Sequence, residues 1–401
     1  MLELEVAVQR ILDSLPSATP ERVALDQAHG RFLTERVSSP VDLPAFDNSA
    51  MDGFAVRAVD LVRATADSPI ALNLLGRVAA GEVFAGEVGP GTCVRIFTGS
   101  AMPRGADAVV MQEDTSVDPA RSGVVMVLDG CKPWENVRLQ GEDVKRGASL
   151  GEFGDELITG RIQLLAAAGL THINTGRRPV CGLLATGSEL VEGGQTLTPG
   201  KIFESNRLGL AMLSQRAGAE TRVFPLVKDT LADTRAALES AFAQCDVVIT
   251  SGGVSVGELD FVKSAFEQLG GEMQFWKVAI RPGRPFVFGR WREKFLFGLP
   301  GNPASAFVTF LLLVRPALRR WQGAANVHSA TGSGVLAEPL TNSAERRFFC
   351  RVTVDAQGRI RSGGAQGSHI MLSLATANGL VDIPPKTTLP SGTVVPVIPL
   401  G

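Results

Sequence analysis

The residues from Asp246 to Pro303 constrain the fold more than any other part of this chain. An apolar run, CDVVITS, leads into SGGVSVGELD, and a second apolar run, FLFG, leads into GLPGNPASAF. Buried strands, each followed by a glycine-rich turn and a helix, are the units of doubly wound α/β sheets. Such sheets bind ligands at the carboxyl ends of their strands, where glycine turns and helix starts favour anions. The sequence therefore predicts a site for a phosphate-bearing ligand at this sheet edge.

The same pattern extends upstream and defines an α/β domain over residues 178–323. RPVCGLLATGSEL and TRVFPLVKDT read as further strands, and LADTRAALESAFAQC reads as a helix. KIFESNRLGLAMLSQRAG predicts a helix that Ser205 caps and Gly218 ends. Alternating strands and helices indicate a doubly wound, mostly parallel sheet. The loops TGSEL, VKDT, SGGVSVGELD and GLPGNP then converge at one edge.

The flanking segments predict three further domains, so the fold class is a multidomain α/β plus β protein. Residues 1–37 read as two helices, the second starting near Ala24, and ITGRIQLLAAAGL reads as another. These segments form a discontinuous helical domain over residues 1–41 and 141–177. Short alternating strands such as CVRIF, DAVVM and GVVMV predict an inserted β-rich domain over residues 42–140. Five short strands predict a C-terminal small β-domain over residues 324–401.

Composition excludes several classes of protein. The 401 residues are 45% hydrophobic and 20% charged, with a net charge of −2, which is typical of a globular protein without nonspecific nucleic-acid binding. No apolar run reaches the roughly 18 residues that span a bilayer, and the acidic N-terminus does not resemble a signal peptide. The five cysteines are scattered and form no CxxC pair, which indicates free thiols in the cytoplasm.

Three carboxylates follow predicted strands at the same sheet edge. Glu189 follows one strand, Asp229 the next, and Asp260 ends the SGGVSVGELD loop. Asp260 can cap the following helix or bind Mg²⁺. Three carboxylates at one edge repel each other unless a hard cation or hydrogen-bond donors compensate, which favours a Mg²⁺ site.

Cations stand close to these acids in the sequence. WKVAIRPGRP carries Lys277, Arg281 and Arg284 on a stretch that suits neither a helix nor a central strand, so we expect a rigid loop. The charges are either solvated surface groups or one side of an oxyanion pocket. Asn302 lies between two prolines at a predicted helix start. The four histidines are dispersed, so neither a histidine metal site nor a covalent triad is indicated.

Three polar residues early in the chain have both a structural and a functional interpretation. Asp52 lies in the acidic turn region FDNSAMDGF, Thr98 precedes a turn glycine, and Asp143 lies in the turn GED. Each fits an ordinary surface turn. Alternatively, Asp52 is presented to a ligand, and the Thr98 hydroxyl holds an oxyanion.

Eight motifs in order give the chain a resemblance to a known family. They are VDLPAFDNSAMDGFAV, RIFTGSAMPRGADAVVMQED, ENVRLQGEDV, TGSEL, SGGVSVGELDFVK, KVAIRPGRP, GLPGNPAS and QGSHI. This order resembles the molybdopterin molybdenumtransferases, the family of bacterial MoeA and of the E domain of gephyrin. The resemblance covers nearly the whole chain.

The resemblance implies an activity and an assembly. The expected reaction inserts molybdenum from molybdate into adenylylated molybdopterin, with Mg²⁺-assisted pyrophosphate cleavage and release of AMP. The expected protein is a cytoplasmic homodimer with four domains per subunit, in which one subunit's α/β domain faces its partner's β-rich domain. Expected partners are a molybdopterin adenylyltransferase and molybdoenzyme maturation factors, with no nucleic acid and no membrane.

The resemblance also assigns residues. Glu189, Asp229 and Asp260 would line the nucleotide and metal side, and Lys277 and Arg281 would meet the anionic ligand. The remaining expected ligand-binding positions are Gly252, Gly253, Ser255, Gly257, Pro300, Asn302 and Pro303. Asp52, Thr98 and Asp143 would complete the cleft from the other subunit. Arg351 and Ser368 match positions implicated in molybdate or pterin handling.

The chain departs from the family pattern at several positions. Ser188 stands where an acid is common, Phe54 where tyrosine is common, and Arg281 and Arg284 replace lysines. Arginine keeps the charge but cannot give up a proton, so these positions support electrostatic binding only.

Two other functions remain open from the sequence. A pathway adenylyltransferase or a CinA-like nucleotide enzyme would share the α/β domain but lack the motifs around Asp52 and Asp143. A gephyrin-like scaffold would bind its ligand without releasing AMP.

Overall fold

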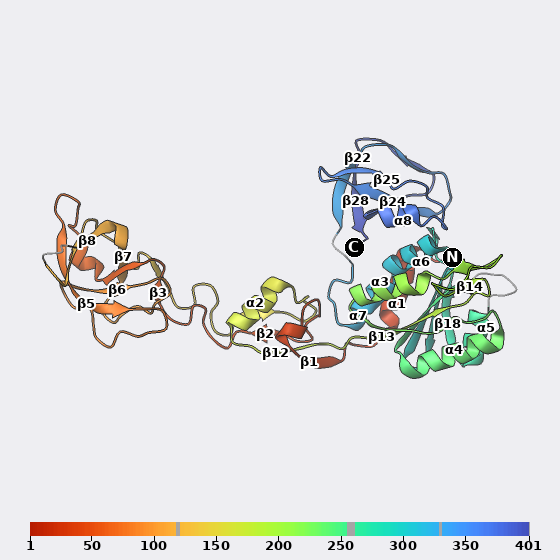
Figure 1. The fold of residues 1–401 in the computed structure, drawn as a ribbon, viewed down its shortest axis with the longest axis horizontal. Helices are drawn as coiled ribbons and strands as arrows, with labels where there is room; N and C mark the ends of the chain where they lie inside the picture. The colour runs from red at the N-terminus through yellow and green to blue at the C-terminus, as the bar shows by residue number, and fades with distance from the viewer. Residues whose placement is uncertain (118–120, 255–260, 329–330, 401) are drawn as a thin grey trace. The chain divides into compact units, whose positions relative to one another are not determined.

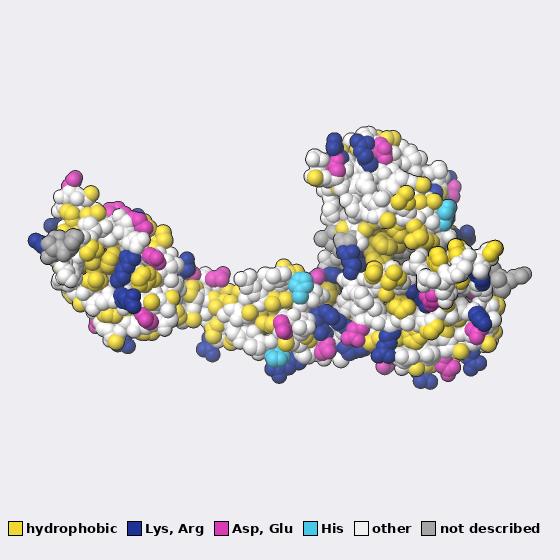
Figure 2. Space-filling model, viewed as in Figure 1, with side chains coloured by type: hydrophobic (Ala, Val, Ile, Leu, Met, Phe, Trp, Pro, Cys, Tyr) yellow, Lys and Arg dark blue, Asp and Glu magenta, His cyan; other side chains and the backbone are white. Residues whose placement is uncertain are grey.

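The computed structural model describes residues 1–117, 121–254, 261–328 and 331–400, which divide into two compact units. The first unit comprises residues 1–35, 152–158 and 172–401, and the second comprises residues 36–151 and 159–171. On the face shown in Figure 2, acidic and basic side chains are interspersed over each unit. Among the described helices, none combines the length and the apolar character that crossing a membrane requires.

A six-stranded, mostly parallel sheet forms the centre of the first unit, as predicted (Figure 1). Its strands, in spatial order, are β16 (Glu220–Val223), β13 (Val180–Ala185), β17 (Val247–Ser251), β21 (Lys294–Leu299), β20 (Val287–Trp291) and β18 (Glu272–Trp276). The strands from β16 to β21 pair in parallel, and β20 and β18 add an antiparallel edge. The carboxyl ends of the parallel strands therefore meet at one edge of the sheet.

Helices cover both faces of this sheet (Figure 1). The helices are α1 (Leu4–Ser14), α3 (Asn206–Arg216), α4 (Leu231–Gln244), α5 (Val262–Gln268), α6 (Pro303–Thr309) and α7 (Arg315–Trp321), with one π-turn at Phe310–Val314 between the last two. Val247 and Ile249 pack with α1, α3, α6 and α7, whereas Val248 packs with α4 and α5. Because successive strand residues point to opposite faces, a sheet covered on both faces needs an uninterrupted apolar run.

The C-terminal residues form a small, closed β-domain, as predicted. Its sheet contains β19 (Ile280–Arg281), β22 (Gly332–Leu336), β24 (Arg347–Val354), β25 (Arg359–Ser362), β26 (Gly379–Ile383) and β28 (Val394–Pro399); β23 (Leu340–Asn342), β27 (Thr387–Leu389) and α8 (Leu372–Thr376) accompany it. β24 pairs with both β25 and β26, which closes the ring of strands. β19 comes from the stretch expected to be a rigid loop, and Ile280 and Arg281 instead extend this sheet beside β24.

The prediction of a second helix starting near Ala24 is wrong. Strand β1 (Pro20–Ala24) pairs antiparallel with β12 (His172–Gly176), and a single 3-10 turn (Leu25–Gln27) follows it. Val23 and Leu25 are buried while Arg22 and Asp26 are exposed. This period of two suits a strand, and pairing with β12, about 150 residues away, outweighs the local helix propensity.

The second unit is built on a β-sheet, in agreement with the expected inserted β-rich domain. Its main sheet has the order β7 (Ala108–Met111), β4 (Gly53–Val56), β6 (Thr92–Ile96), β5 (Ile70–Val78), β9 (Val124–Val127) and β8 (Thr115–Val117). Short pairs join β3 (Asn48–Ser49) to β10 (Val137–Arg138) and β2 (Val37–Ser38) to β11 (Ser149–Gly151). Helix α2 (Thr159–Ala167) is present as predicted and buries Leu165.

The cysteines are all free thiols, which confirms the sequence prediction. Cys93, Cys181, Cys245 and Cys350 are buried. Burial raises the pKa of Cys93 to about 12 and that of Cys350 to about 11. Such thiols remain protonated and unreactive at neutral pH.

Candidate functional site

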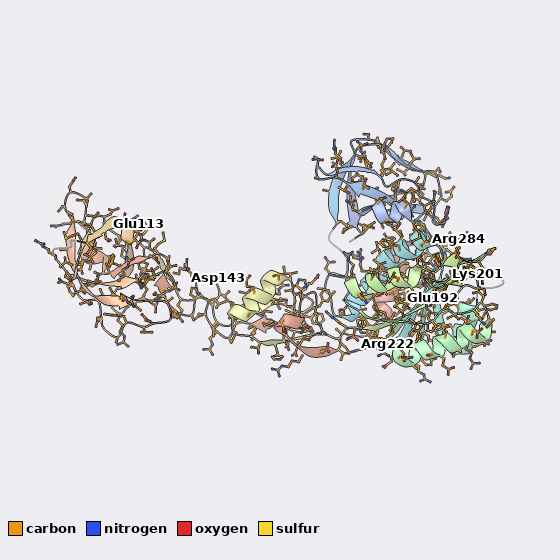
Figure 3. The ribbon with its side chains drawn as sticks, viewed as in Figure 1. Glu113, Asp143, Glu192, Lys201, Arg222 and Arg284 are labelled. Atoms are coloured by element: carbon orange, nitrogen blue, oxygen red, sulfur yellow. The ribbon has the colours of Figure 1, made fainter. Side chains whose placement is uncertain are left out.

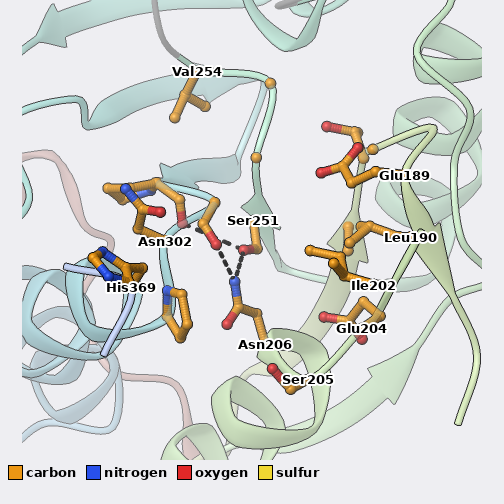
Figure 4. A pocket seen from close by; sticks show the side chains of 18 of the residues that line it. Glu189, Leu190, Ile202, Glu204, Ser205, Asn206, Ser251, Val254, Asn302 and His369 are labelled. Carbon is orange, nitrogen blue, oxygen red and sulfur yellow. Dashed lines mark hydrogen bonds between the residues drawn. The ribbon is translucent and has the colours of Figure 1, made fainter. Parts of the chain in front are cut away.

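An open cavity of about 660 Å³ lies at the carboxyl ends of β13, β17 and β21 (Figure 4). Its lining comes from several loops and the start of α3. It comprises Ala185, Thr186, Gly187, Glu189, Leu190, Ile202, Phe203, Glu204, Ser205, Asn206, Asp229, Ser251, Gly252, Gly253, Val254, Pro285, Pro300, Gly301, Asn302, Pro303, His369 and Met371. The cavity is at the edge of the sheet where the sequence predicts a site. Seven predicted site residues line it: Glu189, Asp229, Gly252, Gly253, Pro300, Asn302 and Pro303.

The two described carboxylates of the predicted metal site belong to neighbouring loops that are tied together. The Ser188 amide donates to Asp229 Oδ2 at 2.7 Å, and the Asp229 amide donates to Ser188 Oγ at 3.3 Å. A Cβ at Gly187 would lie 2.8 Å from Glu189 Oε2, so this carboxylate folds back over the turn. Glu189 and Asp229 therefore stand at one side of the cavity.

The glycine turn after β17 forms the floor of the cavity. Gly252 and Gly253 have φ values of +90° and +68°, a region that only glycine adopts at low cost. The Gly252 amide donates to Leu299 O at 3.1 Å. Within the described ranges, the Gly253 amide donates no hydrogen bond and the buried Thr186 Oγ1 has no partner. The Gly253 amide is therefore available to an anionic ligand, whereas the Thr186 hydroxyl is enclosed against the turn.

The loop before α6 joins the cavity to the C-terminal domain. Asn302 is at the N-cap of α6, and Pro303 is the first helical residue, as predicted. Asn302 Nδ2 donates to Ser368 Oγ at 3.1 Å, and the Ala304 amide donates to Ser368 O at 3.1 Å. These bonds hold the segment that carries Ser368 against the helix start, so His369 reaches the cavity wall (Figure 4).

Asn206 links two of the cavity loops and was missed by the sequence reasoning. Its Nδ2 donates to Ser251 Oγ at 2.8 Å and to Gly301 O at 2.7 Å (Figure 4). The Ser251 hydroxyl donates to Pro300 O at 3.4 Å. The sequence pointed instead to Ser205 as a helix cap, yet its side chain makes no capping bond. The signal available in the sequence was a side-chain amide, that of Asn206, directly after the predicted cap residue Ser205.

A two-stranded flap forms another wall of the cavity. β14 (Leu190–Val191) pairs in parallel with β15 (Ile202–Phe203), and Ile202 and Phe203 are about half exposed. Behind this flap, the Arg207 side chain is only 5% exposed and bonds both Glu204, at 2.9 Å, and Glu192, at 2.8 Å. Burial alone would lower the pKa of Arg207, but these carboxylates raise it. Arg207, also missed from sequence, therefore fixes the flap in place.

The predicted cations lie elsewhere. Lys277 Nζ lies 3.9 Å from the centroid of the Trp276 ring, and the Arg281 guanidinium lies 4.7 Å from that of Phe348. Neither side chain lines the cavity. Burial, and then the charges of Arg284 and Arg281, lower the pKa of Arg346. Arg281, Arg284 and Arg346 thus gather where β19 joins the C-terminal sheet, whereas Lys277 lies against Trp276.

Arg351 has a structural role in the described chain. Arg351 is only 1% exposed, and its Nη2 donates to Ala365 O at 3.2 Å and to Gly367 O at 3.0 Å. Its amide donates to Gln366 Oε1 at 3.0 Å. These bonds hold the segment that leads to Ser368.

The early predicted residues belong to the second unit. Asp52 Oδ1 accepts hydrogen bonds from the amide and the hydroxyl of Thr98, both at 2.8 Å, and these bonds lower the pKa of Asp52. The fold thus brings Asp52 and Thr98 together. Asp143 is exposed on a turn, where its amide donates to Leu43 O at 3.1 Å (Figure 3).

Ser255, Gly257 and Asp260 lie outside the described residues. In the described ranges, no group of three or more His, Cys, Asp or Glu residues is placed to hold a metal ion. The oxygens of Glu189 and Asp229 are nevertheless the hard ligands that Mg²⁺ prefers, and Mg²⁺ commonly keeps several waters beside one or two carboxylates. The donor set therefore fits Mg²⁺ and does not suit a softer metal.

Comparison with known proteins accounts for nearly the whole chain. Residues 2–169 match the family model described as "MoeA N-terminal region (domain I and II)", residues 182–320 match "Probable molybdopterin binding domain", and residues 333–400 match "MoeA C-terminal region (domain IV)". The chain is 38% identical to the molybdopterin molybdenumtransferase of Haemophilus influenzae over 384 residues, which is 94% of this chain and 93% of the relative. It is 35% identical to that of Bacillus subtilis over 96% of this chain and 91% of the relative. The crystal structure of the molybdopterin biosynthesis MoeA protein of Pyrococcus horikoshii OT3 superposes with a TM-score of 0.85 at 30% identity, covering 99% of each chain.

Proposed function

Because this chain belongs to the molybdopterin molybdenumtransferase family and is a transferase of molybdenum cofactor biosynthesis, we propose a specific course for its reaction. It takes adenylylated molybdopterin and molybdate; the oxygen of a water or of molybdate attacks a phosphorus of the pyrophosphate with the help of Mg²⁺, AMP leaves, and molybdenum is inserted. The observation that carries this proposal is the meeting of a glycine turn and two carboxylates in one cavity of about 660 Å³. That volume lies within the range of roughly 300–1,000 Å³ that small-molecule sites occupy.

The glycine turn receives the pyrophosphate. The Gly253 amide is a donor without a described partner, and the enclosed Thr186 hydroxyl lies against this turn and supports it. Asn206 holds the β17 and β21 turns at a fixed separation through Ser251 and Gly301. A phosphate group held by such prearranged donors gains charge stabilisation without reorganisation of the site.

The carboxylates and the flap receive the other parts of the substrate. Glu189 and Asp229 would hold Mg²⁺, which would neutralise the charge that develops on the phosphate oxygens. Leu190, Ile202 and Phe203 offer an apolar wall to a flat heterocycle. Asp229 keeps its position because the Ser188 amide bonds it at 2.7 Å.

The reaction is tested by release of AMP from purified protein supplied with adenylylated molybdopterin, Mg²⁺ and molybdate. Glu189→Gln and Asp229→Asn remove the charge at nearly constant shape, and each should lower turnover at least tenfold while the protein remains folded. Gln215→Ala serves as the control, because Gln215 lies on α3 outside the cavity and its side chain bonds Thr221. Unchanged turnover in both acid variants, or adenylylation of molybdopterin from ATP, would contradict the proposed reaction.

The proposal also includes an assembly. The protein works in the cytoplasm as a homodimer, in which Asp52, Thr98 and Asp143 of one subunit complete the cavity of the other. A molybdopterin adenylyltransferase supplies its substrate, and molybdoenzyme maturation factors take up its product. The bond between Asp52 and Thr98 supports this role, because it presents a low-pKa carboxylate on the surface of the second unit.

Mixed dimers test the shared cleft. Subunits with Asp52→Ala and subunits with Asp229→Ala should each be inactive alone. When they are mixed, about half of the dimers contain both kinds of subunit, and each of these has one intact site. The mixture should therefore regain, per dimer, up to about half of one site's activity. The absence of rescue in mixtures shown to contain heterodimers would indicate that each site is built within one chain.

A further inference from the structure

A second, smaller pocket of about 120 Å³ lies at the far end of α3 from the cavity. It is lined by Leu213, Arg216, Ala217, Phe310, Leu311, Arg315, Arg319, Pro399 and Leu400, and it shares no residue with the cavity at the sheet edge. Asn206 at the start of α3 lines the cavity, whereas Arg216 at the end of α3 lines the small pocket. The 11 residues of α3 correspond to about 16 Å of helix, so the two sites are distinct.

The pocket gathers three arginines, and no carboxylate is among its described lining residues. Arg319 Nη2 bonds Glu156 at 2.9 Å outside the pocket. In the described part of the chain, Arg216 and Arg315 form no ion pair, and the buried Nε atoms of Arg315 and Arg319 have no hydrogen-bond partner. Arg216 is exposed, whereas Arg315 and Arg319 are partly buried, and partly buried guanidinium groups ordinarily find partners because leaving them unpaired costs free energy.

The arginines also repel one another. Burial, followed by the charges of Arg319 and Arg216, lowers the pKa of Arg315 to about 10. The remaining lining is apolar, so little of this repulsion is screened by polar neighbours. A bound anion would relieve the repulsion by pairing with the accessible ends of the guanidinium groups, because the Nε atoms themselves are enclosed.

We propose that Arg216, Arg315 and Arg319 form a binding site for a tetrahedral oxyanion of the phosphate type. The pocket volume of about 120 Å³ equals the share of roughly four waters in the liquid, which is enough for a five-atom oxyanion. Guanidinium groups bind such oxygens through paired, charge-assisted hydrogen bonds. The site does not depend on the proposed reaction, because none of its residues takes part in the cavity.

The proposal is tested by titrating the full-length protein with inorganic phosphate and following binding by calorimetry and by the thermal unfolding midpoint. Sodium chloride at equal ionic strength is the reference. Charge screening changes the unfolding midpoint equally in both salts, whereas a specific ligand raises the midpoint further. Arg315→Gln and Arg216→Gln should each weaken phosphate binding at least tenfold. Arg320→Gln is the matched control, because Arg320 lies on the same helix as Arg315 but does not line the pocket.

Arg315→Met gives a second readout that a purely structural arginine would not produce. Without phosphate, this variant should be at least as stable as the parent, because an unpaired buried charge is replaced by an apolar side chain. With phosphate, the parent should become more stable than this variant. If Arg315→Met lowers the unfolding midpoint equally with and without phosphate, Arg315 is a packing residue and the proposal is wrong.

A further arm identifies the occupant. Phenyl phosphate that binds as tightly as inorganic phosphate indicates a phosphate ester as the ligand, and its failure to bind indicates the free ion; both outcomes support the site. Phosphate binding that is unchanged in both Arg315→Gln and Arg216→Gln would overturn the proposal.

Discussion

Gly253→Ala tests whether the cavity floor depends on the absence of a side chain. The φ of +68° at Gly253 costs a residue with a Cβ about 1–2 kcal/mol. The new Cβ would also lie 2.7 Å from Val262 Cγ2 and 2.8 Å from Thr186 Oγ1. Both neighbours are β-branched and buried, so neither can swing aside, and overpacking of this kind costs about 1–3 kcal/mol. The free energy of unfolding should therefore fall by about 2–5 kcal/mol.

Gly194→Ala is the matched control for this experiment. Gly194 also has a positive φ, of +86°, but a Cβ there meets no atom within 4 Å. This variant should lose only the backbone contribution of about 1–2 kcal/mol. The difference between the two variants isolates the steric contribution at the cavity floor.

Urea unfolding followed by tryptophan fluorescence measures both variants. The Trp276 indole donates to Val254 O at 3.3 Å, next to the substituted glycine, so its emission reports on this turn. Gly253→Ala should also reduce kcat/KM for AMP release, because the crowded methyl group displaces the turn that carries the Gly253 amide. A Gly253→Ala loss no greater than that of Gly194→Ala would refute the steric argument.

Two further substitutions test hydrogen bonds that hold the sheet edge. Asn206→Asp keeps the shape of the side chain but loses the Nδ2 group that donates to Ser251 and Gly301. The free energy of unfolding, measured in urea, should fall by about 1–3 kcal/mol, and AMP release should slow. Parent-like values for both would contradict its role as a link. Burial alone would raise the pKa of Asp246, but bonds from Arg177 and from the amide of residue 180 lower it below 3.8. The stability that this carboxylate contributes is therefore fully present above about pH 4 and is lost as the pH falls through the lowered pKa. Asp246→Asn should be less stable than the parent at pH 7, and the difference in stability between the two proteins should close in acid. A gap that does not change between pH 7 and pH 2 in thermal unfolding would rule this out.

The arrangement of strands, turns and helices in the α/β domain could be predicted from sequence. The runs that become β17 and β21 are mostly apolar and are followed by glycine-containing turns, and these signals depend only on neighbouring residues. Parallel strands place their carboxyl ends at one edge, so Glu189, Asp229 and the glycine turn could be assigned to a single site before any coordinates.

Partners distant in sequence could not be predicted in this way. Ile280 and Arg281 read locally as a loop, yet they pair with β24, which begins at residue 347. The segment at Pro20–Ala24 read as the start of a helix, yet it pairs with β12. In each case the decisive interaction is a strand pairing whose gain exceeds the cost of closing a long loop, and local propensity contains no information about it.

The sequence by itself determined the family, the order of the domains and the identity of the acids and glycines at the site. Only the tertiary structure decided which side chains hold those groups in place. Asn206 joins residues 45 and 95 positions away, and Arg351 is buried behind the segment that carries Ser368. A side chain selects its hydrogen-bond partners from whatever the packed fold brings within about 3 Å, and that set exists only once distant segments have met.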